Sequence, residues 1–546
     1  MPMRIRPTLV ALLAILGSCV IHAQDASRMD TIVRSYADSR AFMGAVLVAR
    51  DGQVLFDKAY GFANLEWNTP NTPSTRFRLG SVTKQFTAAS ILLLEERGKL
   101  KTSEPVGKYM PDAPAAWGGI TIFNLLTHTS GIPNFTSFPE YRQLERFDTP
   151  VRDVIAKFRD RPLDFAPGEK MLYSNSGYVV LGYLVEKISG QDYESFVQQN
   201  IFTPLGMKDS GYDSNTRIIA QRAAGYTPGR DGLRNADFVH MSVPHGAGAL
   251  YSTTHDLLLW EQGLFGGKLL SAASLAKMTT PFKGDYGLGV MIQTVNGRKR
   301  ISHGGSIEGF NTSLVYFPDS RVAVISLGNV NGNAPDRMTD QLGRLVHGDA
   351  VQLTSERTEV PVARDILARY VGTYQLAPQV SMMMTLDGNQ LMTQLSGQPR
   401  LPVFPQSETL FFLKAVDAQV EFVKDEKGAV TAAVLHQNGR DQRAPRISDT
   451  VLERREVQVA PAVLASYAGT YALRPGADLV VTVENGQLVT QLGPQPKVPF
   501  FAESETRFFA RMVDAQIEFR KDATGAISGL VLHQGPANLE AQRKAP

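Results

Sequence analysis

The C-terminal third of the chain is an internal duplication. The segment Tyr370-Val371-Gly372-Thr373-Tyr374 recurs as Tyr467-Ala468-Gly469-Thr470-Tyr471, and about half of the positions that follow are identical at a constant offset of 97 residues. A match of this length without a gap requires that a whole domain was duplicated. Short alternating runs, broken by turns such as Asp387-Gly388, predict an all-β small barrel or sandwich in each copy. We therefore expect two separate β-domains, at residues 360–456 and 457–546.

The length of 546 residues is too great for a single hydrophobic core and indicates about three domains. Apolar residues make up 43% of the chain and charged residues 20%, as in ordinary globular proteins. The net charge is only +3 and no cluster of lysine and arginine stands out, so nucleic-acid binding is not expected. Residues 24–350 are left as one further domain, joined to the repeats by the polar linker Gln352–Glu359.

The first 23 residues have the composition of a secretion signal. Two arginines form a basic start, and the apolar run Leu9–Leu16 is too short to span a bilayer as a permanent helix. Cleavage after Ala23 would leave a periplasmic or secreted chain without a thiol, because Cys19 is the only cysteine. The alternative is a lipoprotein anchored at Cys19, which follows the lipobox-like Leu16-Gly17-Ser18.

Ser81 and Lys84 are spaced for nucleophilic catalysis. Side chains three residues apart on a helix lie on one face, so the lysine amine can reach the serine hydroxyl. A serine hydroxyl needs an adjacent base at neutral pH. A lysine held neutral by burial or by its neighbours can serve, or a charged lysine can hold a tyrosine phenolate in place. The apolar run Phe86–Leu94 closes at Gly98, which predicts a buried helix with Ser81 at its N-terminus. The positive end of that helix would favour an alkoxide and an oxyanion.

Two later motifs give the serine–lysine pair its catalytic interpretation. Tyr173-Ser174-Asn175 supplies a second proton carrier, and the glycines of His303-Gly304-Gly305 let a strand backbone approach a substrate closely. Around these motifs, Asp51-Gly52 predicts a hairpin turn. Gly287–Val290 and Val322–Leu327 are predicted to be strands on either side of His303.

The motifs belong to a larger set of segments, which are Phe77–Thr87, Leu125–Ile132, Pro167–Glu169 leading into Tyr173-Ser174-Asn175, Pro204–Met207, Gly246–Thr253 and His303–Ser306. This set resembles the serine β-lactamases and penicillin-recognising hydrolases, in their class C, D-peptidase and esterase branch. The resemblance spans residues 28–345. It implies an α+β fold, with an antiparallel sheet flanked by helices, an inserted helical lobe and the active site between the two. The C-terminal repeats resemble the lipocalin-like domain often appended to this family.

The resemblance also implies a role for each motif residue. Ser81 would be the acylated nucleophile, and Lys84 would take or shuttle its proton. Tyr173 would act as general base and then as acid to the leaving group, while Asn175 would bind the substrate amide or hold the lysine. The backbone N–H groups of Ser81 and Ser306 would form an oxyanion hole. Acyl transfer would proceed to serine and then to water, without a metal or other cofactor.

His303 departs from the pattern of class C β-lactamases, which usually carry Lys-Thr-Gly at this motif. A lysine there is a permanent cation that helps to bind a substrate carboxylate, whereas a histidine is mostly neutral above its ordinary pKa of about 6.5. Tyr173 would have less help in losing its proton, although His303 would still belong to the catalytic set and Gly305 to the substrate-binding set. The departure favours an esterase or a peptidase. The alternative is that His303 is only a hydrogen-bonding strand residue.

The leading hypothesis is therefore an exported serine hydrolase that acts on esters or on D-amino-acid-type peptide amides. One alternative is a true β-lactamase or a penicillin-binding D,D-carboxypeptidase. Another is a non-catalytic protein that recognises peptidoglycan or a partner at the cell wall, although the presence of the full motif set argues against it. Residues 131–150, rich in aromatic and charged side chains, are predicted to form part of the cleft rim. The histidines lack carboxylates at zinc-ligand spacing, so no metal site is expected.

Overall fold

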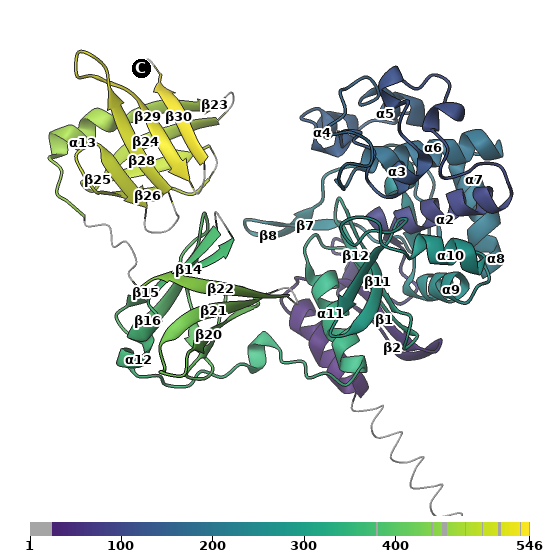
Figure 1. Ribbon diagram of the computed structural model, residues 1–546, viewed down its shortest axis with the longest axis horizontal. Helices are drawn as coiled ribbons and strands as arrows, with labels where there is room; N and C mark the ends of the chain where they lie inside the picture. The colour runs from purple at the N-terminus through teal and green to yellow at the C-terminus, as the bar shows by residue number, and fades with distance from the viewer. Residues whose placement is uncertain are drawn as a thin grey trace, which may run out of the picture. The chain divides into compact units, whose positions relative to one another are not determined.

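The computed structural model describes residues 25–377, 380–437, 440–449, 456–474, 477–493, 495–510, 515–534 and 537–544, and the predicted secretion signal with Cys19 lies outside them. The chain divides into two compact units, residues 1–351 and 352–546 (Figure 1). The first unit contains all of the catalytic motifs, and the second contains both repeats. Among the described residues, no helix combines the length and apolar character that crossing a membrane requires.

The first unit is built on a six-stranded antiparallel sheet with the order β10-β11-β12-β13-β1-β2 (Figure 1). β1 and β13 are buried along nearly their whole length, as expected for central strands covered on both faces. The predicted turn Asp51-Gly52 is confirmed, with both residues in the left-handed region. The strands are β1 (Gly44–Arg50), β2 (Gln53–Tyr60), β10 (Met291–Val295), β11 (Arg298–Ile307), β12 (Phe310–Phe317) and β13 (Val322–Gly328).

Two helices cover opposite faces of this sheet. α11 (Ala334–Val346) packs on Phe317 of β12. α9 (Thr254–Phe265) stacks its last residue, Phe265, on the neighbouring Tyr316, with 4.2 Å between the ring centroids. Consecutive strand residues point to opposite faces, so the two helices lie on opposite sides of the sheet.

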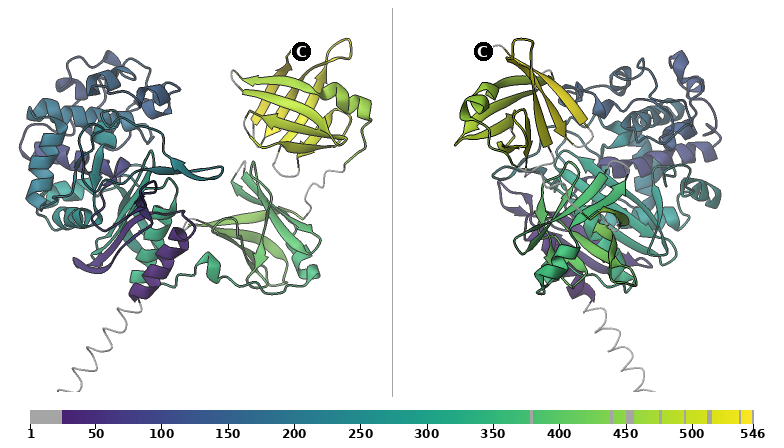
Figure 2. Two further views of the ribbon diagram at one scale, coloured as in Figure 1. Left: turned by 180° about the vertical axis from the view of Figure 1, so that it is seen from behind. Right: turned by 60° about the vertical axis from the view of Figure 1, so that its left-hand side comes forward.

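A helical lobe, seen in Figure 2, is inserted in the sequence between the strands of the sheet. Many of the core residues of this unit belong to α2. Every residue of α2 from Thr83 to Leu94 is buried, and the apolar run Phe86–Leu94 predicted to form a buried helix lies within it. Ser81 lies in the short 3-10 turn Gly80–Val82 directly before α2, and Gly98 follows the helix in the left-handed region. The α+β class with an inserted helical lobe is thereby confirmed. The helices are α2 (Thr83–Glu96), α3 (Ile122–Leu126), α4 (Tyr141–Leu144), α5 (Val151–Ala156), α6 (Asn175–Ser189), α7 (Tyr193–Val197), α8 (Thr203–Leu205) and α10 (Ala272–Met278).

The prediction of a strand at Gly287–Val290 is wrong. Gly289 has a φ of +74°, and a β-carbon there would lie 2.7 Å from the carbonyl oxygen of Lys84, so the chain bends sharply against α2. Strand β10 begins only afterwards, at Met291. The other predicted strand, Val322–Leu327, is confirmed within β13. The remaining strands of this unit are short: β3 (Phe62–Asn64), β4 (Thr69–Pro70), β5 (Phe77–Arg78), β6 (Gly211–Tyr212), β7 (Tyr226–Gly229), β8 (Gly232–Asn235) and β9 (Leu250–Ser252).

Each repeat forms an antiparallel barrel that follows a short helix. In the second copy the barrel closes through eight strands, β23 to β30. In the first copy the strand that corresponds to β26 is interrupted at Val403, so its halves, β17 and β18, stand at the two ends of a nine-stranded sheet. Both barrels are filled by matching aromatic stacks, Tyr370 on Phe422 and Tyr467 on Phe519, each with 4.0 Å between centroids.

The bounds in the first repeat are α12 (Arg364–Arg369), β14 (Gly372–Ala377), β15 (Val380–Asp387), β16 (Gln390–Leu395), β17 (Leu401–Pro402), β18 (Phe404–Pro405), β19 (Leu410–Phe412), β20 (Ala418–Lys424), β21 (Val430–Gln437) and β22 (Arg440–Ser448). Those in the second are α13 (Pro461–Tyr467), β23 (Gly469–Arg474), β24 (Ala477–Glu484), β25 (Gln487–Leu492), β26 (Val498–Ala502), β27 (Arg507–Ala510), β28 (Ala515–Lys521), β29 (Ile527–Gln534) and β30 (Ala537–Arg543).

Candidate active site

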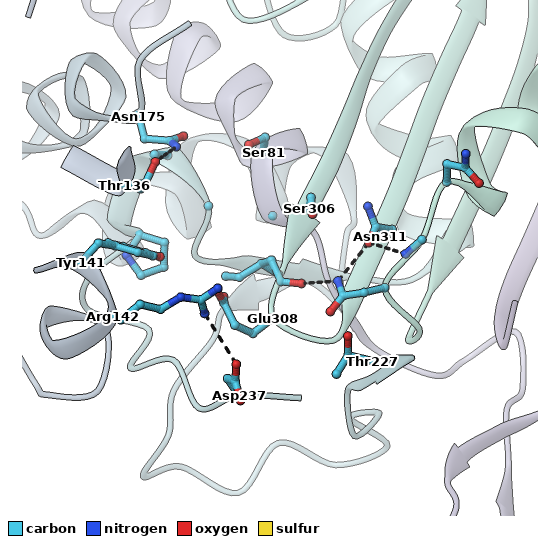
Figure 3. Close-up of a pocket in the computed structure, with 18 of the residues that line it drawn as sticks. Ser81, Thr136, Tyr141, Arg142, Asn175, Thr227, Asp237, Ser306, Glu308 and Asn311 are labelled. Atoms are coloured by element: carbon cyan, nitrogen blue, oxygen red, sulfur yellow. Dashed lines mark hydrogen bonds and ion pairs between the residues drawn. The ribbon is translucent and has the colours of Figure 1, made fainter. Parts of the chain in front are cut away.

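A pocket of about 700 Å³ opens between the sheet and the helical lobe, with Ser81 in its wall (Figure 3). The lobe contributes residues of the predicted cleft rim, which confirms that prediction for part of the segment. The sheet contributes the turn between β11 and β12 and the start of α11. The lining includes Gly80, Ser81, Phe135, Thr136, Tyr141, Arg142, Asn175, Thr227, Arg234, Asp237, Ala247, Gly248, Ser306, Glu308, Asn311, Asn331, Asn333 and Asp336.

Lys84 is completely buried beside Ser81, and three oxygen atoms surround its amine. Its Nζ lies 3.0 Å from Ser81 Oγ, 2.8 Å from Asn175 Oδ1 and 2.8 Å from the carbonyl oxygen of Ala247. Burial lowers the pKa of Lys84 well below its ordinary value. The Asn175 and Ala247 oxygens can only accept hydrogen bonds, so a neutral amine gives them both of its protons. Its lone pair is then left for the hydroxyl proton of Ser81.

Asn175 begins α6 and is held at both ends of its side chain. Its Oδ1 accepts the bond from Lys84, and its Nδ2 donates to Thr136 Oγ1 at 3.1 Å. Its backbone N–H donates to Asn134 Oδ1 at 3.0 Å. Sequence reasoning left open whether this asparagine holds the lysine or binds a substrate amide, and the structure shows the contact with Lys84.

Tyr173 lies on the other side of the lysine amine. The Nζ of Lys84 is 4.9 Å from the centre of the phenol ring. The centre of the His128 ring lies 4.2 Å from the centre of the same phenol ring. Burial raises the pKa of Tyr173, and a hydrogen bond with Ser81 only partly opposes that rise. The side chain is therefore a neutral phenol at neutral pH. It can donate a proton, but it is not deprotonated in the resting enzyme and so cannot act as a base there.

The third motif brings the backbone of β11 against the nucleophile. A β-carbon on Gly80 would lie 2.9 Å from the backbone nitrogen of Ser306, and one on Gly305 would lie 1.9 Å from the carbonyl oxygen of Leu79. That carbonyl also accepts a hydrogen bond from Thr312 Oγ1 at 2.8 Å. Only glycine fits at both positions, so the Ser306 N–H comes close to the turn that carries Ser81. Two backbone donors near a serine oxygen are the arrangement of an oxyanion hole.

His303 is buried beneath the site and does not line the pocket. Its Nδ1 donates to the Gly304 carbonyl at 2.6 Å, because a carbonyl can only accept, and its Nε2 accepts from Tyr286 Oη at 3.0 Å. Burial lowers the pKa of His303 to about 3. Both ring nitrogens are thus occupied within the protein. These contacts match the alternative interpretation, in which His303 is only a hydrogen-bonding strand residue.

Three contributors to the site escaped sequence reasoning. Ala247 acts through its carbonyl oxygen, which any residue type could supply, although the glycines that flank it hinted at a special backbone. Tyr286 fixes His303, and nothing in its local sequence signals that role. His128, with a φ of +56°, accepts a hydrogen bond from the Ser174 N–H and supports the Tyr173 ring. In the part of the chain that the structure describes, no three His, Cys, Asp or Glu side chains are grouped as metal ligands would be.

Five charged side chains line the pocket, and they are two arginines, Arg142 and Arg234, and three acids, Asp237, Glu308 and Asp336. Arg142 reaches into it and lies 3.6 Å from Asp237, with Glu308 beside it (Figure 3). Burial, and secondarily repulsion by the neighbouring Glu145 carboxyl, raises the pKa of Glu308. Asp336 also lines the pocket, and its carboxylate would be 3.3 Å from a β-carbon on Gly304. The pocket therefore has no surplus of positive charge with which to bind a substrate carboxylate.

Comparisons with known proteins agree with this geometry. Residues 29–348 match the family described as Beta-lactamase, and residues 356–446 and 453–545 each match a domain of unknown function, DUF3471. The chain is 30% identical to penicillin-binding protein 4* of Bacillus subtilis (strain 168), over 77% of this chain and 98% of that protein. It is 27% identical to teichoic acid D-alanine hydrolase of Staphylococcus aureus (strain MRSA252), over 55% and 73% respectively. The crystal structure of a penicillin-binding protein from Bacillus halodurans covers 58% of this chain and 98% of its own, with a TM-score of 0.53 and 28% identity.

Proposed function

Because the chain belongs to the β-lactamase family of serine hydrolases, we propose that it cleaves esters, or amides of the D-amino-acid type, through an acyl-enzyme on Ser81. The observation that carries this proposal is the set of contacts around Lys84. Its amine is held by two oxygen atoms that can only accept hydrogen bonds, Asn175 Oδ1 and the carbonyl oxygen of Ala247. The third contact of the amine is with the hydroxyl of Ser81. The lowered pKa of the lysine favours its neutral amine, the form that can accept a proton.

The geometry supports a complete proton path. Lys84 takes the hydroxyl proton of Ser81 as its Oγ bonds to the substrate carbonyl carbon, and the negative oxygen is held by the N–H groups of Ser81 and Ser306. Tyr173, a phenol at neutral pH, gives its proton to the leaving oxygen or nitrogen as that bond breaks, and is reprotonated from Lys84. Water then attacks the acyl-enzyme by the same steps in reverse, which restores the free serine.

The pocket and its relatives support a substrate without an essential carboxylate. The neutral His303 offers no fixed cation beside the tyrosine, as a carboxylate-bearing β-lactam would need, and the two arginines of the pocket are outnumbered by three acidic side chains. The name of one relative, teichoic acid D-alanine hydrolase, favours D-amino-acid esters among the candidates. The names of others, such as penicillin-binding protein 4*, favour a β-lactam-recognising enzyme as the second candidate. We further propose that the mature protein acts outside the cytoplasm, after loss of residues 1–23.

A substrate panel tests this proposal. The purified mature chain is assayed with p-nitrophenyl acetate, with D-alanine p-nitroanilide and with the β-lactam nitrocefin. We expect kcat/KM for the ester or the anilide to exceed that for nitrocefin. Faster turnover of nitrocefin would favour a true β-lactamase, and stable acylation by penicillin without turnover of any substrate would favour a penicillin-binding or sensing protein.

A further inference from the structure

Asn311, at the start of β12, presents its side-chain amide to the pocket in a single orientation (Figure 3). Its Oδ1 accepts hydrogen bonds from Asn331 Nδ2 at 3.0 Å and from the backbone N–H of Gly332 at 3.1 Å. A backbone N–H can only donate, so the oxygen must face Gly332 and the amino group must face away from it. Within the described residues, the Nδ2 of Asn311 has no hydrogen-bond partner.

The residue that orients Asn311 is itself fixed. Asn331 Oδ1 accepts from the Gly309 N–H at 2.8 Å, and its Nδ2 also donates to the Ile307 carbonyl at 3.0 Å. These bonds lock the loop after β13 onto the turn between β11 and β12. The amide of Asn311 is therefore preorganised. A ligand that accepts a hydrogen bond from its free N–H group binds without the loss of side-chain entropy that orienting the amide would otherwise require.

Asn311 also has a defined place relative to the reacting serine. It is the direct cross-strand partner of Ser306, so both side chains stand on the same face of the sheet. Figure 3 shows Asn175 and Asn311 on opposite sides of Ser81 and Ser306. With the acyl part of the substrate placed toward Asn175, for which the family resemblance implies contact with the substrate amide, Asn311 faces the leaving group.

We propose that Asn311 is a specificity-determining residue that donates from Nδ2 to a neutral oxygen, a carbonyl or a hydroxyl, on the leaving-group side of the substrate. A carboxylate is a poorer occupant because the three acidic side chains of the pocket, Asp237, Glu308 and Asp336, outnumber its two arginines, Arg142 and Arg234. This inference rests on the proposed function, since it assumes that Ser81 is acylated.

Aryl acetates test the inference, because they share one acyl-enzyme and differ only in the leaving group. The full chain and its Asn311→Asp variant are compared with phenyl acetate and with its 4-acetyl, 4-hydroxymethyl and 4-carboxy derivatives. Aspartate still accepts from Asn331 and Gly332 but loses the donor. We expect kcat/KM to fall about 5- to 50-fold for the 4-acetyl or the 4-hydroxymethyl ester, and to stay within about twofold for phenyl acetate. A fall for the 4-acetyl ester would identify a carbonyl as the acceptor, and a fall for the 4-hydroxymethyl ester would identify a hydroxyl.

A matched control is Asn64→Asp, outside the pocket. Asn64 Oδ1 accepts from the Trp67 N–H at 2.8 Å, a bond that aspartate also keeps. Its kinetics should match those of the unsubstituted chain for all four esters. An equal loss for every ester in Asn311→Asp, or no loss for any, would overturn the inference. Turnover of phenyl acetate that persists in Ser81→Ala would instead refute the proposed function, so the two failures are distinguishable.

Discussion

The α-carbon of Gly305 packs so closely on the carbonyl oxygen of Leu79 that a β-carbon would lie 1.9 Å from it. Leu79 stands two residues before Ser81, and Gly305 directly precedes Ser306. This one backbone contact therefore sets the spacing between the nucleophile and the second N–H group of the oxyanion hole.

Gly305→Ala should separate the two backbones. We expect kcat/KM for p-nitrophenyl acetate to fall about 100- to 1,000-fold, the usual effect of losing one oxyanion donor. Overpacking should also lower the free energy of unfolding by about 1–3 kcal/mol. Gly107→Ala is the matched control, because a β-carbon at Gly107 meets no atom within 4 Å. Unchanged kinetics in Gly305→Ala would show that the oxyanion hole does not depend on this contact.

Lys84→Arg tests whether the lysine must lose its proton. Arginine keeps the positive charge but does not deprotonate in proteins, so we expect kcat/KM to fall about 100- to 10,000-fold. Lys277→Arg is a control from a second Ser-x-x-Lys pattern, Ser274 to Lys277, which lies on α10, where Lys277 pairs with Glu95 at 2.8 Å. That variant should retain full activity. Substantial turnover by Lys84→Arg would assign the lysine an electrostatic role only.

The pH dependence of kcat/KM should follow the neutral form of Lys84. Because burial lowers the pKa of this lysine, activity should rise from acid to mildly alkaline pH and then level off. The apparent pKa values would belong to the coupled pair of Lys84 and Tyr173. His303, with its pKa of about 3, should add no step in that range. A flat profile between about pH 5 and 9 would contradict the proton path.

His303 should make the first unit less stable in acid. In the unfolded chain it binds a proton below about pH 6.5, whereas in the folded chain it does so only near pH 3. The unfolded state thus binds more protons between these values, and stability falls as the pH falls through that window. His303→Gln should reduce the slope by up to about 1.4 kcal/mol per pH unit.

Tryptophan fluorescence can report this effect for the first unit alone, because Trp67, Trp117 and Trp260 are the only tryptophans in the chain. Urea unfolding of the full chain at several pH values gives the slope. The matched control is His255→Gln, which replaces a half-exposed histidine. An unchanged slope in His303→Gln would mean that the ring is not held neutral by burial.

The sequence could predict the parts of the site that depend on residue type and local spacing. Ser81 and Lys84 lie one helical turn apart, and Tyr173 and Asn175 flank the start of α6, so short motifs reveal them. The α+β class followed from the family resemblance of the motif set, and the duplicated β-domains followed from alternation and repetition in the sequence.

Other parts depended on contacts between distant segments. The Ala247 carbonyl that holds Lys84 carries no residue-type signal, and the bond between Tyr286 and His303 forms only when a bend meets a strand. The bend at Gly287–Val290 was mistaken for a strand because its apolar residues are buried against α2, which hydrophobic alternation alone cannot distinguish from a sheet.

The most direct test of the account is the pre-steady-state hydrolysis of a p-nitrophenyl ester by the mature chain and by its Ser81→Ala variant. We predict a burst of about one p-nitrophenol per chain, followed by slower turnover, as an acyl-enzyme requires, and the loss of both in the variant. Turnover that survives in Ser81→Ala, or the absence of burst and turnover in both proteins, would contradict the assignment of Ser81 as the nucleophile of this hydrolase.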